Sequence, residues 1–377
     1  MSKVAVLQCN EYNKDDVYNS IKRGIELLGG FDKFIKHDEK ILLKPNMLRA
    51  HEPDKATTTH PVIFEAVIRL LLENNYSVSY GDSPGFGSPQ YVAQVTGLDA
   101  VAQKYHIPLL DFENGEIVSF PEGKQTKQFE IARGVLQSDA LISLPKMKSH
   151  QLTRITGAVK NQLGCVFGLN KAAFHIKFPN PVDFSRMLTD LNNLVKTRLY
   201  IMDGIIAMEG NGPASGNPKK MGVILISDDP VAIDATFCKL IDLNPDFVPI
   251  LRFGKESGLG NYENIEYCGD SIDQLINTSF DVVRSPVKDE TLFGFLSPLK
   301  NLLIRRPIID IATCKKCGIC VEACPVNGKA LFQKTKADFP YYNYKKCIRC
   351  YCCQEMCPHK AIKVKIPFFG KLLFYRK

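Results

Sequence analysis

Short runs rich in apolar and β-branched residues alternate with amphipathic stretches from the N-terminus to about residue 270. The runs predict β-strands at Val4–Leu7, Ile41–Leu43, Ser77–Tyr80, Ala140–Leu144, Leu199–Met202 and Gly222–Ile226. Apolar positions at helical spacing between them predict helices at Asp15–Leu28, Pro61–Glu73, Pro181–Leu194 and Pro230–Ile241. Strands that alternate with helices favour an α/β fold with a mostly parallel sheet covered by helices on both faces.

Two of the predicted helices start in the way that capping requires. Pro61 follows His60, and Pro230 follows Asp229, so a proline stands in the first turn behind a residue that can cap it. We therefore interpret His60 as a helix-start residue rather than a ligand. Asp234 stands in an apolar helical run, so it is either buried and paired or turned toward a site.

The pattern loosens after the α/β stretch and predicts four parts. Residues 1–278 form the α/β domain, and residues 279–307, which contain Pro286, Pro298 and Pro307, form a connector that packs partly on the protein. Residues 308–366 form a small α+β domain, and residues 367–377 form an apolar and basic tail. We expect the tail to pack on the protein rather than to rest on a membrane surface.

Nine of the thirteen cysteines fall between Cys314 and Cys357. The N-terminal residues predict a first strand rather than a signal peptide, and no apolar run reaches the roughly 18 residues of a membrane span. Cysteines clustered in a chain without an export signal indicate metal ligation in a reducing compartment. We therefore expect a cytoplasmic metalloprotein.

The clustered cysteines repeat one frame, Cys-x-x-Cys-x-x-Cys-x-x-x-Cys-Pro, at an offset of 33 residues. Three cysteines spaced in this way wrap one face of a cubane, and the fourth ligates the other cluster. The frame predicts two 4Fe–4S clusters, one held by Cys314, Cys317, Cys320 and Cys357 and the other by Cys347, Cys350, Cys353 and Cys324. The alternative is a pair of structural zinc sites, which prefer two separated Cys-x-x-Cys hooks. Cys352 is out of frame and is interpreted as a spare thiol.

This segment, from about Ile308 to Ile366, resembles the bacterial two-cluster ferredoxins, which carry single low-potential electrons. Free ferredoxins are usually acidic, whereas residues 301–377 contain 16 Lys and Arg against 4 Asp and Glu. The resemblance and the charge together imply a built-in electron carrier that docks a redox partner protein with an acidic face. A nucleic-acid partner is not expected, because no recognition motif accompanies the basic residues.

Polar residues follow the carboxyl ends of the predicted strands, where ligands bind in open α/β sheets. Four cationic side chains are candidate catalytic residues: Lys146, Lys148, His150 and Lys160. A further set is the candidate binding site for a cofactor or ligand: Lys44, Asn46, Asp82, Ser83, Asp203 and Glu209. The lysines and histidine would converge on a carboxylate or phosphate, while the acids would hold a cation, accept a proton or neutralise the lysines. Ordinary solvated loops are the alternative for any single stretch.

The same residues carry a second resemblance. The motifs are similar, in order, to those of the family called domain of unknown function 362: KPN at Lys44–Asn46, THP at Thr59–Pro61, GDSPG at Gly81–Gly85, LPKMKSH at Leu144–His150, GAVKN at Gly157–Asn161 and DPVAIDAT at Asp229–Thr236. Members often carry a two-cluster ferredoxin module, as this chain does. The resemblance implies one structural unit with a shared site, and it implies no particular reaction.

Three functions follow from these patterns. The favoured one is an iron–sulfur oxidoreductase that passes electrons through two clusters to an anionic substrate or cofactor held by the α/β domain. The alternative is a non-catalytic ferredoxin-type carrier or accessory protein, active for example in maturation, whose α/β domain docks a partner or ligand. The third, nucleic-acid binding through the basic tail, lacks a recognition motif.

Overall fold

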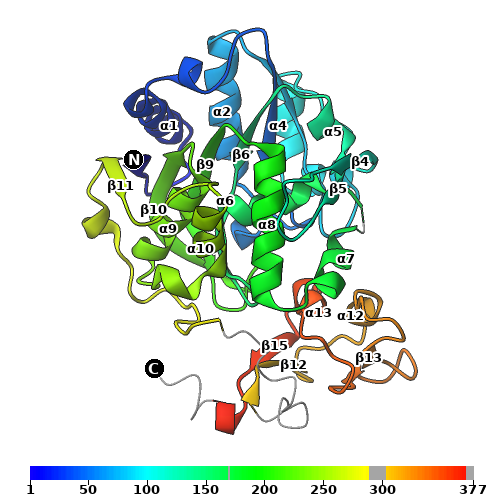
Figure 1. Ribbon diagram of the computed structural model, residues 1–377. Helices are drawn as coiled ribbons and strands as arrows, with labels where there is room; N and C mark the ends of the chain where they lie inside the picture. The colour runs from blue at the N-terminus through cyan, green and yellow to red at the C-terminus, as the bar shows by residue number, and fades with distance from the viewer. Residues whose placement is uncertain (169, 288–302, 371–377) are drawn as a thin grey trace.

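The computed structural model describes residues 1–168, 170–287 and 303–370. Its centre is a nine-stranded sheet in the order β11-β1-β10-β9-β6-β2-β3, with β7 paired to β9 and β8 paired to β7 (Figure 1). The strands are β1 (Ser2–Gln8), β2 (Lys40–Pro45), β3 (Ser77–Tyr80), β6 (Ala140–Leu144), β7 (Lys146–His150), β8 (Arg154–Thr156), β9 (Leu199–Glu209), β10 (Asn217–Ser227) and β11 (Ile265–Gly269). A separate hairpin joins β4 (Gly115–Ser119) to β5 (Gln128–Ala132).

The sheet is mostly parallel. Strands β3, β2, β6 and β9 run in one direction, and β7 continues beside β9 in that direction. Strand β10 is antiparallel to both β9 and β1, and β8 is antiparallel to β7. The carboxyl ends of β2, β3, β6 and β7 therefore lie at the same edge of the sheet, where a ligand site is expected.

Helices cover both faces of this sheet. The helices are α1 (Lys14–Leu28), α2 (Pro61–Glu73), α3 (Pro89–Val95), α4 (Leu98–Lys104), α5 (Arg133–Leu136), α6 (Ala158–Asn161), α7 (Asn170–Lys177), α8 (Pro181–Val195), α9 (Pro230–Leu240) and α10 (Pro249–Glu256). Helices α1 to α4 pack on one face, and α6, α8, α9 and α10 pack on the other (Figure 1).

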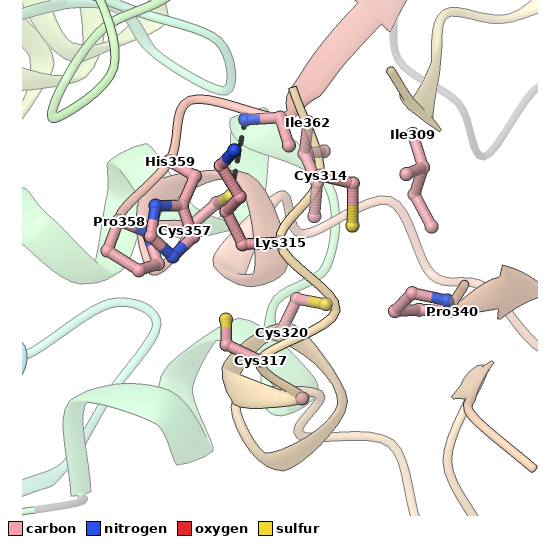
Figure 2. A pocket seen from close by; sticks show the side chains of 12 residues that line it. Ile309, Cys314, Lys315, Cys317, Cys320, Pro340, Cys357, Pro358, His359 and Ile362 are labelled. Carbon is pink, nitrogen blue, oxygen red and sulfur yellow. Dashed lines mark hydrogen bonds between the residues drawn. The ribbon is translucent and has the colours of Figure 1, made fainter. Parts of the chain in front are cut away.

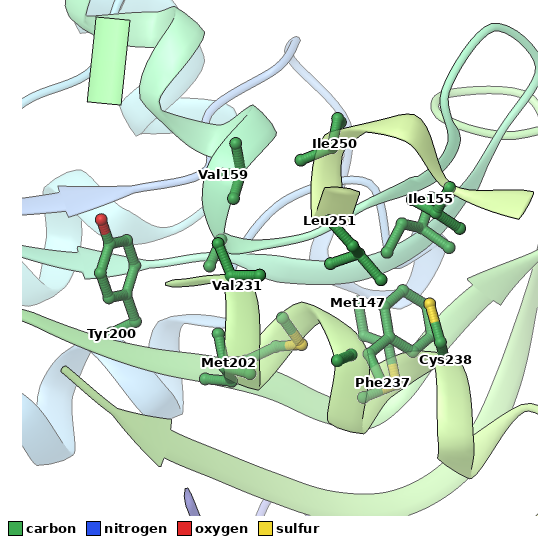
Figure 3. Close-up of a cluster of buried hydrophobic side chains, with 14 of the residues drawn as sticks. Met147, Ile155, Val159, Tyr200, Met202, Val231, Phe237, Cys238, Ile250 and Leu251 are labelled. Carbon is green, nitrogen blue, oxygen red and sulfur yellow. The ribbon is translucent and has the colours of Figure 1, made fainter. Parts of the chain in front are cut away.

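Alternate residues of the central strands supply two separate cores. On β1, Val4 and Val6 face the core beneath α8, α9 and α10, while Ala5 and Leu7 face the core beneath α1 and α2. The first of these cores is drawn in Figure 3, where Val231 of α9 and Leu251 of α10 lie over the sheet. Because side chains on a strand alternate between its faces, a sheet buried on both faces needs continuous apolar runs.

The six predicted strands and the four predicted helices are all present, most of them within a few residues of their expected bounds. Two strands are longer than predicted, because β9 continues to Glu209 and β10 begins at Asn217. His60 and Asp229 cap α2 and α9 through bonds from backbone N–H groups, as their positions indicated. Asp234 is buried and accepts hydrogen bonds from the backbone of Ala158 and Val159 at 2.6 and 3.1 Å, so it is paired and holds the start of α6.

The solvated-loop alternative does not hold for the LPKMKSH segment. Lys146–His150 forms the fully buried strand β7, which the sequence pattern did not predict. Met147 points into the core shown in Figure 3, while the two flanking lysines find polar partners inside the protein. Likewise, Asp203 lies within β9 rather than in a loop, because β9 continues to Glu209 alongside β7.

The C-terminal module repeats one small unit twice. Its helices α12 (Ile319–Glu322) and α13 (Cys352–Glu355) occupy the same position in the two copies of the cysteine frame. Its strands form two pairs, β12 (Arg306–Ile309) with β15 (Ile362–Lys365), and β13 (Leu331–Phe332) with β14 (Tyr341–Tyr342). In Figure 1 this module, in orange and red, lies at one end of the α/β part, with α12 and α13 toward α7.

Parts of two expected regions lie outside the described residues, namely 288–302 of the connector and 371–377 of the tail. Across the described part of the chain, no helix combines the length and the apolar character that crossing a membrane requires.

Candidate functional site

A large cavity lies between the carboxyl edge of the sheet and the C-terminal module. It contains about 1560 Å³ of empty space, part of it open to solvent. Loops after β2 and β3 and helices α6 and α7 supply one side, while α12, α13 and Cys324 supply the other. The cysteine-rich module thus closes the site predicted at the strand ends. The strand pattern did not indicate that the module would lie there.

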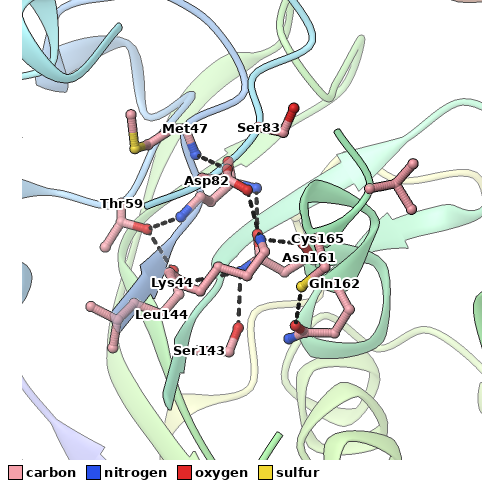
Figure 4. Close-up of polar contacts among 12 residues, drawn as sticks. Lys44, Met47, Thr59, Asp82, Ser83, Ser143, Leu144, Asn161, Gln162 and Cys165 are labelled. Carbon is pink, nitrogen blue, oxygen red and sulfur yellow. Dashed lines mark hydrogen bonds and ion pairs between the residues drawn. The ribbon is translucent and has the colours of Figure 1, made fainter. Parts of the chain in front are cut away.

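Lys44 and Asp82 form a buried ion pair at the floor of this cavity. The Lys44 Nζ lies 2.8 Å from Asp82 Oδ1 and donates to the Asn161 carbonyl at 2.6 Å (Figure 4). The other oxygen of Asp82 accepts from the Met47 backbone N–H at 2.7 Å. Gly164 is needed here, because a Cβ at that position would lie 1.8 Å from Asp82 Oδ1.

Lys148 lies beside this pair on β7 and is fully buried without a direct carboxylate partner. Its Nζ donates to Asn46 Oδ1 at 2.8 Å and to the Thr57 carbonyl at 2.7 Å. Asn46 in turn donates to Asn161 Oδ1 at 2.8 Å. Burial, and then the nearby Lys160 and Lys146, lower the pKa of Lys148 well below its usual range. A negative charge in the cavity would therefore be stabilised here.

Three further basic side chains of the α/β part line the cavity. Lys160 of α6 is 9% exposed, and its ammonium makes no hydrogen bond or ion pair with another described residue. Lys171 of α7 donates to the Ser83 and Val166 carbonyls at 3.1 and 3.2 Å, and burial lowers its pKa to about 8. His175, also on α7, stacks on Phe184 and is kept neutral near pH 7, because burial lowers its pKa to about 4.

His150 and Glu355 connect the two parts of the protein. Nδ1 of His150 accepts the backbone N–H groups of Leu152 and Thr153, so the proton of the neutral ring lies on Nε2, 3.1 Å from Glu355 Oε1. Burial lowers the pKa of His150 to about 4. Burial also opposes ionisation of Glu355, yet His150 and Lys160 beside it hold its pKa at about 2. Glu355 is thus a carboxylate carried by the module into a basic pocket of the α/β part.

Lys146 and Asp203 form a second buried pair that does not line the cavity. Their Nζ and Oδ2 atoms lie 2.8 Å apart, and the Tyr12 hydroxyl contacts both residues at 2.8 and 2.9 Å. The Tyr12 ring stacks on His60. Glu209, also predicted for the site, accepts instead from the Asp281 backbone N–H at 2.9 Å.

The cysteines of the C-terminal module gather in two groups of four. Cys314, Cys317, Cys320 and Cys357 line one pocket, which contains about 330 Å³ of empty space (Figure 2). The other group lines a pocket of about 310 Å³ and consists of Cys324, Cys347, Cys350 and Cys353. Each pocket therefore takes three cysteines from one copy of the frame and the fourth from the other copy.

Hydrogen-bond donors point at several of these sulfur atoms. Backbone N–H groups of Ala330 and Ala361 donate to Cys324 Sγ and Cys357 Sγ, each at 3.3 Å. The Tyr342 hydroxyl lies 3.3 Å from Cys353 Sγ. Such donors stabilise thiolate charge and raise the reduction potential of a cluster. The arrangement fits thiolate ligands around two cubanes.

Among the described residues, no three His, Cys, Asp or Glu side chains come together closely enough for a single metal ion. Cys352, the out-of-frame thiol, is buried and lines the large cavity rather than either cysteine pocket.

The structure brings most of the predicted polar residues to one place. Seven of the ten line the large cavity or pair with a residue that does, two lie apart with Tyr12 at Lys146 and Asp203, and Glu209 lies elsewhere. The residues that the sequence did not single out are Lys171, His175 and Glu355. Glu355 had a signal in the sequence, because it is one of only four acidic residues after residue 301 and lies between two frame cysteines.

Two solved structures resemble this chain weakly. The lactate racemase apoprotein of Thermoanaerobacterium thermosaccharolyticum is similar over 60% of this chain and 55% of that one, with 14% identity and a TM-score of 0.41. A protein from Thermotoga maritima is similar over 59% of this chain and 57% of that one, with 11% identity and a TM-score of 0.37. The chain thus spans little more than half the length of either structure.

A relative by sequence is the thylakoid-associated protein sll1697 of Synechocystis, which is 32% identical over 260 residues, or 69% of this chain and 80% of that protein. Residues 306–358 match the 4Fe–4S dicluster domain, so the chain carries an iron–sulfur electron-transfer module. Residues 41–239 match the family described as domain of unknown function (DUF362). The matched segment makes up more than half of the chain and contains the motifs around Lys44, Asp82, Lys148 and Asp234. This protein therefore belongs to the DUF362 family, and it carries a 4Fe–4S dicluster domain toward its C-terminal end.

Proposed function

We propose that this protein is an iron–sulfur oxidoreductase that passes electrons from two 4Fe–4S clusters to an anionic substrate or cofactor in the large cavity. One observation carries the proposal: Cys324 lines both a cysteine pocket and the large cavity. A cluster held at Cys324 would border the cavity directly, without an intervening layer of protein. That contact is what electron delivery to a bound molecule requires.

The ligand sets follow from the two pockets. Cys314, Cys317, Cys320 and Cys357 would hold the first cluster, and Cys324, Cys347, Cys350 and Cys353 the second. When bound, the clusters supply single electrons at a potential set by hydrogen bonds and burial. The protein contributes donors such as Ala330 N–H and Tyr342 OH, which tune the second cluster.

The two clusters differ in their distance from solvent, which supports a direction for electron flow. Cys317 of the first set is exposed, and Lys315 lines the same pocket. A redox partner with an acidic face would dock there and deliver electrons to the first cluster. The second cluster would then pass them to the cavity.

An anion is the ligand that this cavity fits best. Lys148 and Lys160 lie at its floor with no carboxylate hydrogen-bonded to either ammonium among the described residues, and Lys171 lies beside them. Of the acids that line the cavity, Asp82 is paired with Lys44, and Glu322 is exposed. Glu355 faces the neutral His150 ring, with Lys160 nearby. The cations would therefore hold a carboxylate or phosphate, and Asn46 and Ser83 would orient it.

The test is electron transfer out of chemically reduced protein. Anaerobically purified protein is reduced, mixed with a small-molecule extract, and followed by cluster absorbance. We expect the extract to reoxidise the clusters, and we expect Lys160→Met to abolish this while iron content and absorbance stay intact. Lys124→Met is the control, because Lys124 is exposed on the β4–β5 loop.

A different result is expected if the protein is a non-catalytic carrier or accessory protein. Reduced protein would then pass electrons to a protein acceptor only, at equal rates in the wild type and in Lys160→Met. That outcome would contradict the oxidoreductase proposal and favour docking as the purpose of the α/β domain.

A further inference from the structure

The lining of the large cavity has a charged side and an apolar side. The charged side is the floor already described, with Lys148 and Lys160. The apolar side combines residues of the α/β part with residues of the C-terminal module: Leu48, Phe86, Leu163, Ile319 and Met356. Such a division indicates an occupant that is itself divided, with one anionic end and one apolar end.

Lys160 is the group on the charged side with an unfilled hydrogen-bonding position. Burial lowers the pKa of its ammonium, and the nearby Glu355 carboxylate raises that pKa again. The Oε1 of Glu355 faces the His150 ring at 3.1 Å, and no described side chain forms a hydrogen bond or an ion pair with the Lys160 ammonium. An incoming carboxylate would accept a hydrogen bond from Lys160 and would add to the counter-charge that Glu355 supplies from nearby.

The apolar side requires more than a small inorganic ion. Phe86 is 50% exposed although it borders the cavity, and Leu163 and Met356 are also lining residues. Phosphate on the lysines would leave these side chains in water. An apolar body of the ligand would cover them, and removing apolar surface from water is favourable.

We infer that the cavity binds a carboxylic acid with an aromatic or unsaturated hydrocarbon body, its carboxylate on Lys160 and its body against Phe86, Leu163 and Met356. This inference rests on the proposed function, because it names the class of molecule that would receive the electrons. It excludes phosphate and short-chain acids as the preferred occupants.

Binding to the oxidised holoprotein tests the inference without any turnover. Isothermal titration compares cinnamate with three probes that each lack one feature: acetate, inorganic phosphate and cinnamyl alcohol. We expect cinnamate to bind at least tenfold more tightly than any of the three. Equal binding of acetate or phosphate, or equal binding of cinnamyl alcohol, would overturn the inference, as would an absence of cinnamate binding.

Two variants locate the site. Lys160→Met should weaken cinnamate binding at least tenfold and leave cinnamyl alcohol unchanged, whereas Phe86→Ala should weaken both. Lys124→Met should match the wild type. Cinnamate binding that survives Lys160→Met would overturn the inference.

The failure of this inference can be told apart from failure of the proposed function. If aromatic acids do not bind, yet an extract still reoxidises reduced clusters in a Lys160-dependent manner, the ligand class alone is wrong. If aromatic acids bind as expected but reduced clusters are not reoxidised by any extract, the electron-transfer proposal is wrong.

Discussion

Buried lysines define the chemistry of the cavity, and their partners decide what each can do. Lys44 and Lys146 form ion pairs with Asp82 and Asp203, respectively, so each pair has no net charge. Lys148 has neutral oxygen partners, and Lys160 has none among the described side chains. The unmatched charge is therefore concentrated on the cavity side of the sheet, where an anion would stabilise it.

Lys171 makes anion binding depend on pH. Burial lowers its pKa to about 8, with Asp82 raising it and Lys44 lowering it again. The side chain is a cation below that pKa and neutral above it, so affinity for cinnamate should be greatest below pH 8 and should fall up to tenfold per pH unit above it. Titrations between pH 6.5 and 9.5 measure the fall.

Lys171→Met provides the matched comparison for that titration. The step near pH 8 should disappear in this variant, while the anion affinity at pH 9.5 should equal that of the wild type. A wild-type affinity that is flat across pH 8 would show that Lys171 does not face the bound anion.

The sequence could predict which residues surround the site but not how they pair. Polar residues after parallel strands must meet at one edge, and Lys44, Asn46, Asp82 and Ser83 do lie together there. Pairing depends on distances across the sheet. The spacing of Lys146 and Lys148 along the chain therefore could not show that they have different partners, Asp203 for Lys146 and the Thr57 carbonyl for Lys148. These residues remain proposed ligand contacts.

The two copies of the repeated unit have similar backbone angles but different surroundings. Lys316 and Arg349, equivalent residues in the two cysteine frames, both have positive φ angles of 59° and 62°. Gly318 and Tyr351 are also equivalent, and both have positive φ angles, of 79° and 63°. Glycine adopts this conformation readily, whereas it is strained for tyrosine. The Tyr351 hydroxyl donates to the Arg305 carbonyl at 3.1 Å. The frame predicted the repeat, whereas only α13 packs closely against the α/β part.

Strand β7 shows the limit of the pattern at this scale. A run with Lys146, Lys148 and His150 has the polarity of a solvated loop, and yet all five of its residues are buried. Its polar groups are satisfied by residues far apart in the sequence, such as Asp203 and Thr57. Local polarity cannot reveal such partners, so the sequence did not predict this strand.

Glu322 and Glu355 are equivalent positions of α12 and α13, and they provide a matched pair of substitutions. Glu355→Ala removes a buried carboxylate that faces His150 and Lys160, so the free energy of unfolding should fall by about 3 kcal/mol. Glu322→Ala affects an exposed residue and should change it by less than about 0.5 kcal/mol. Urea unfolding of anaerobic holoprotein measures both.

Hydrogen exchange shows where the loss of Glu355 acts. The loop after β9 should exchange faster in Glu355→Ala, because Gln354 next to it donates to the Asn211 carbonyl at 2.8 Å. Equal destabilisation by both substitutions would indicate that Glu355 is not a structural link between the two parts.

At the scale of the whole molecule, the proposed function separates the place where electrons would enter from the cavity where a ligand would bind. The cavity faces Cys324 at the inner end of the module, and the exposed Cys317 marks the outer end. The net positive charge of the chain lies in residues 301–377, which contain 16 Lys and Arg against 4 Asp and Glu, whereas the first 300 residues contain 32 against 36. This distribution would orient an acidic electron donor toward the outer end rather than toward the α/β part.

Ionic strength tests this orientation. The rate constant for cluster reduction by an acidic ferredoxin should fall about tenfold or more between low and high salt, because screening weakens attraction between separated charges. Reduction by a neutral photoreduced deazaflavin should hardly change. Stopped-flow absorbance measures both rates.

Lys315→Glu, beside Cys317, should slow the ferredoxin reaction and reduce its salt dependence, whereas Lys124→Glu on the α/β surface should not. If the two variants slow the reaction equally, only net charge matters, and the entrance does not lie at the first cluster.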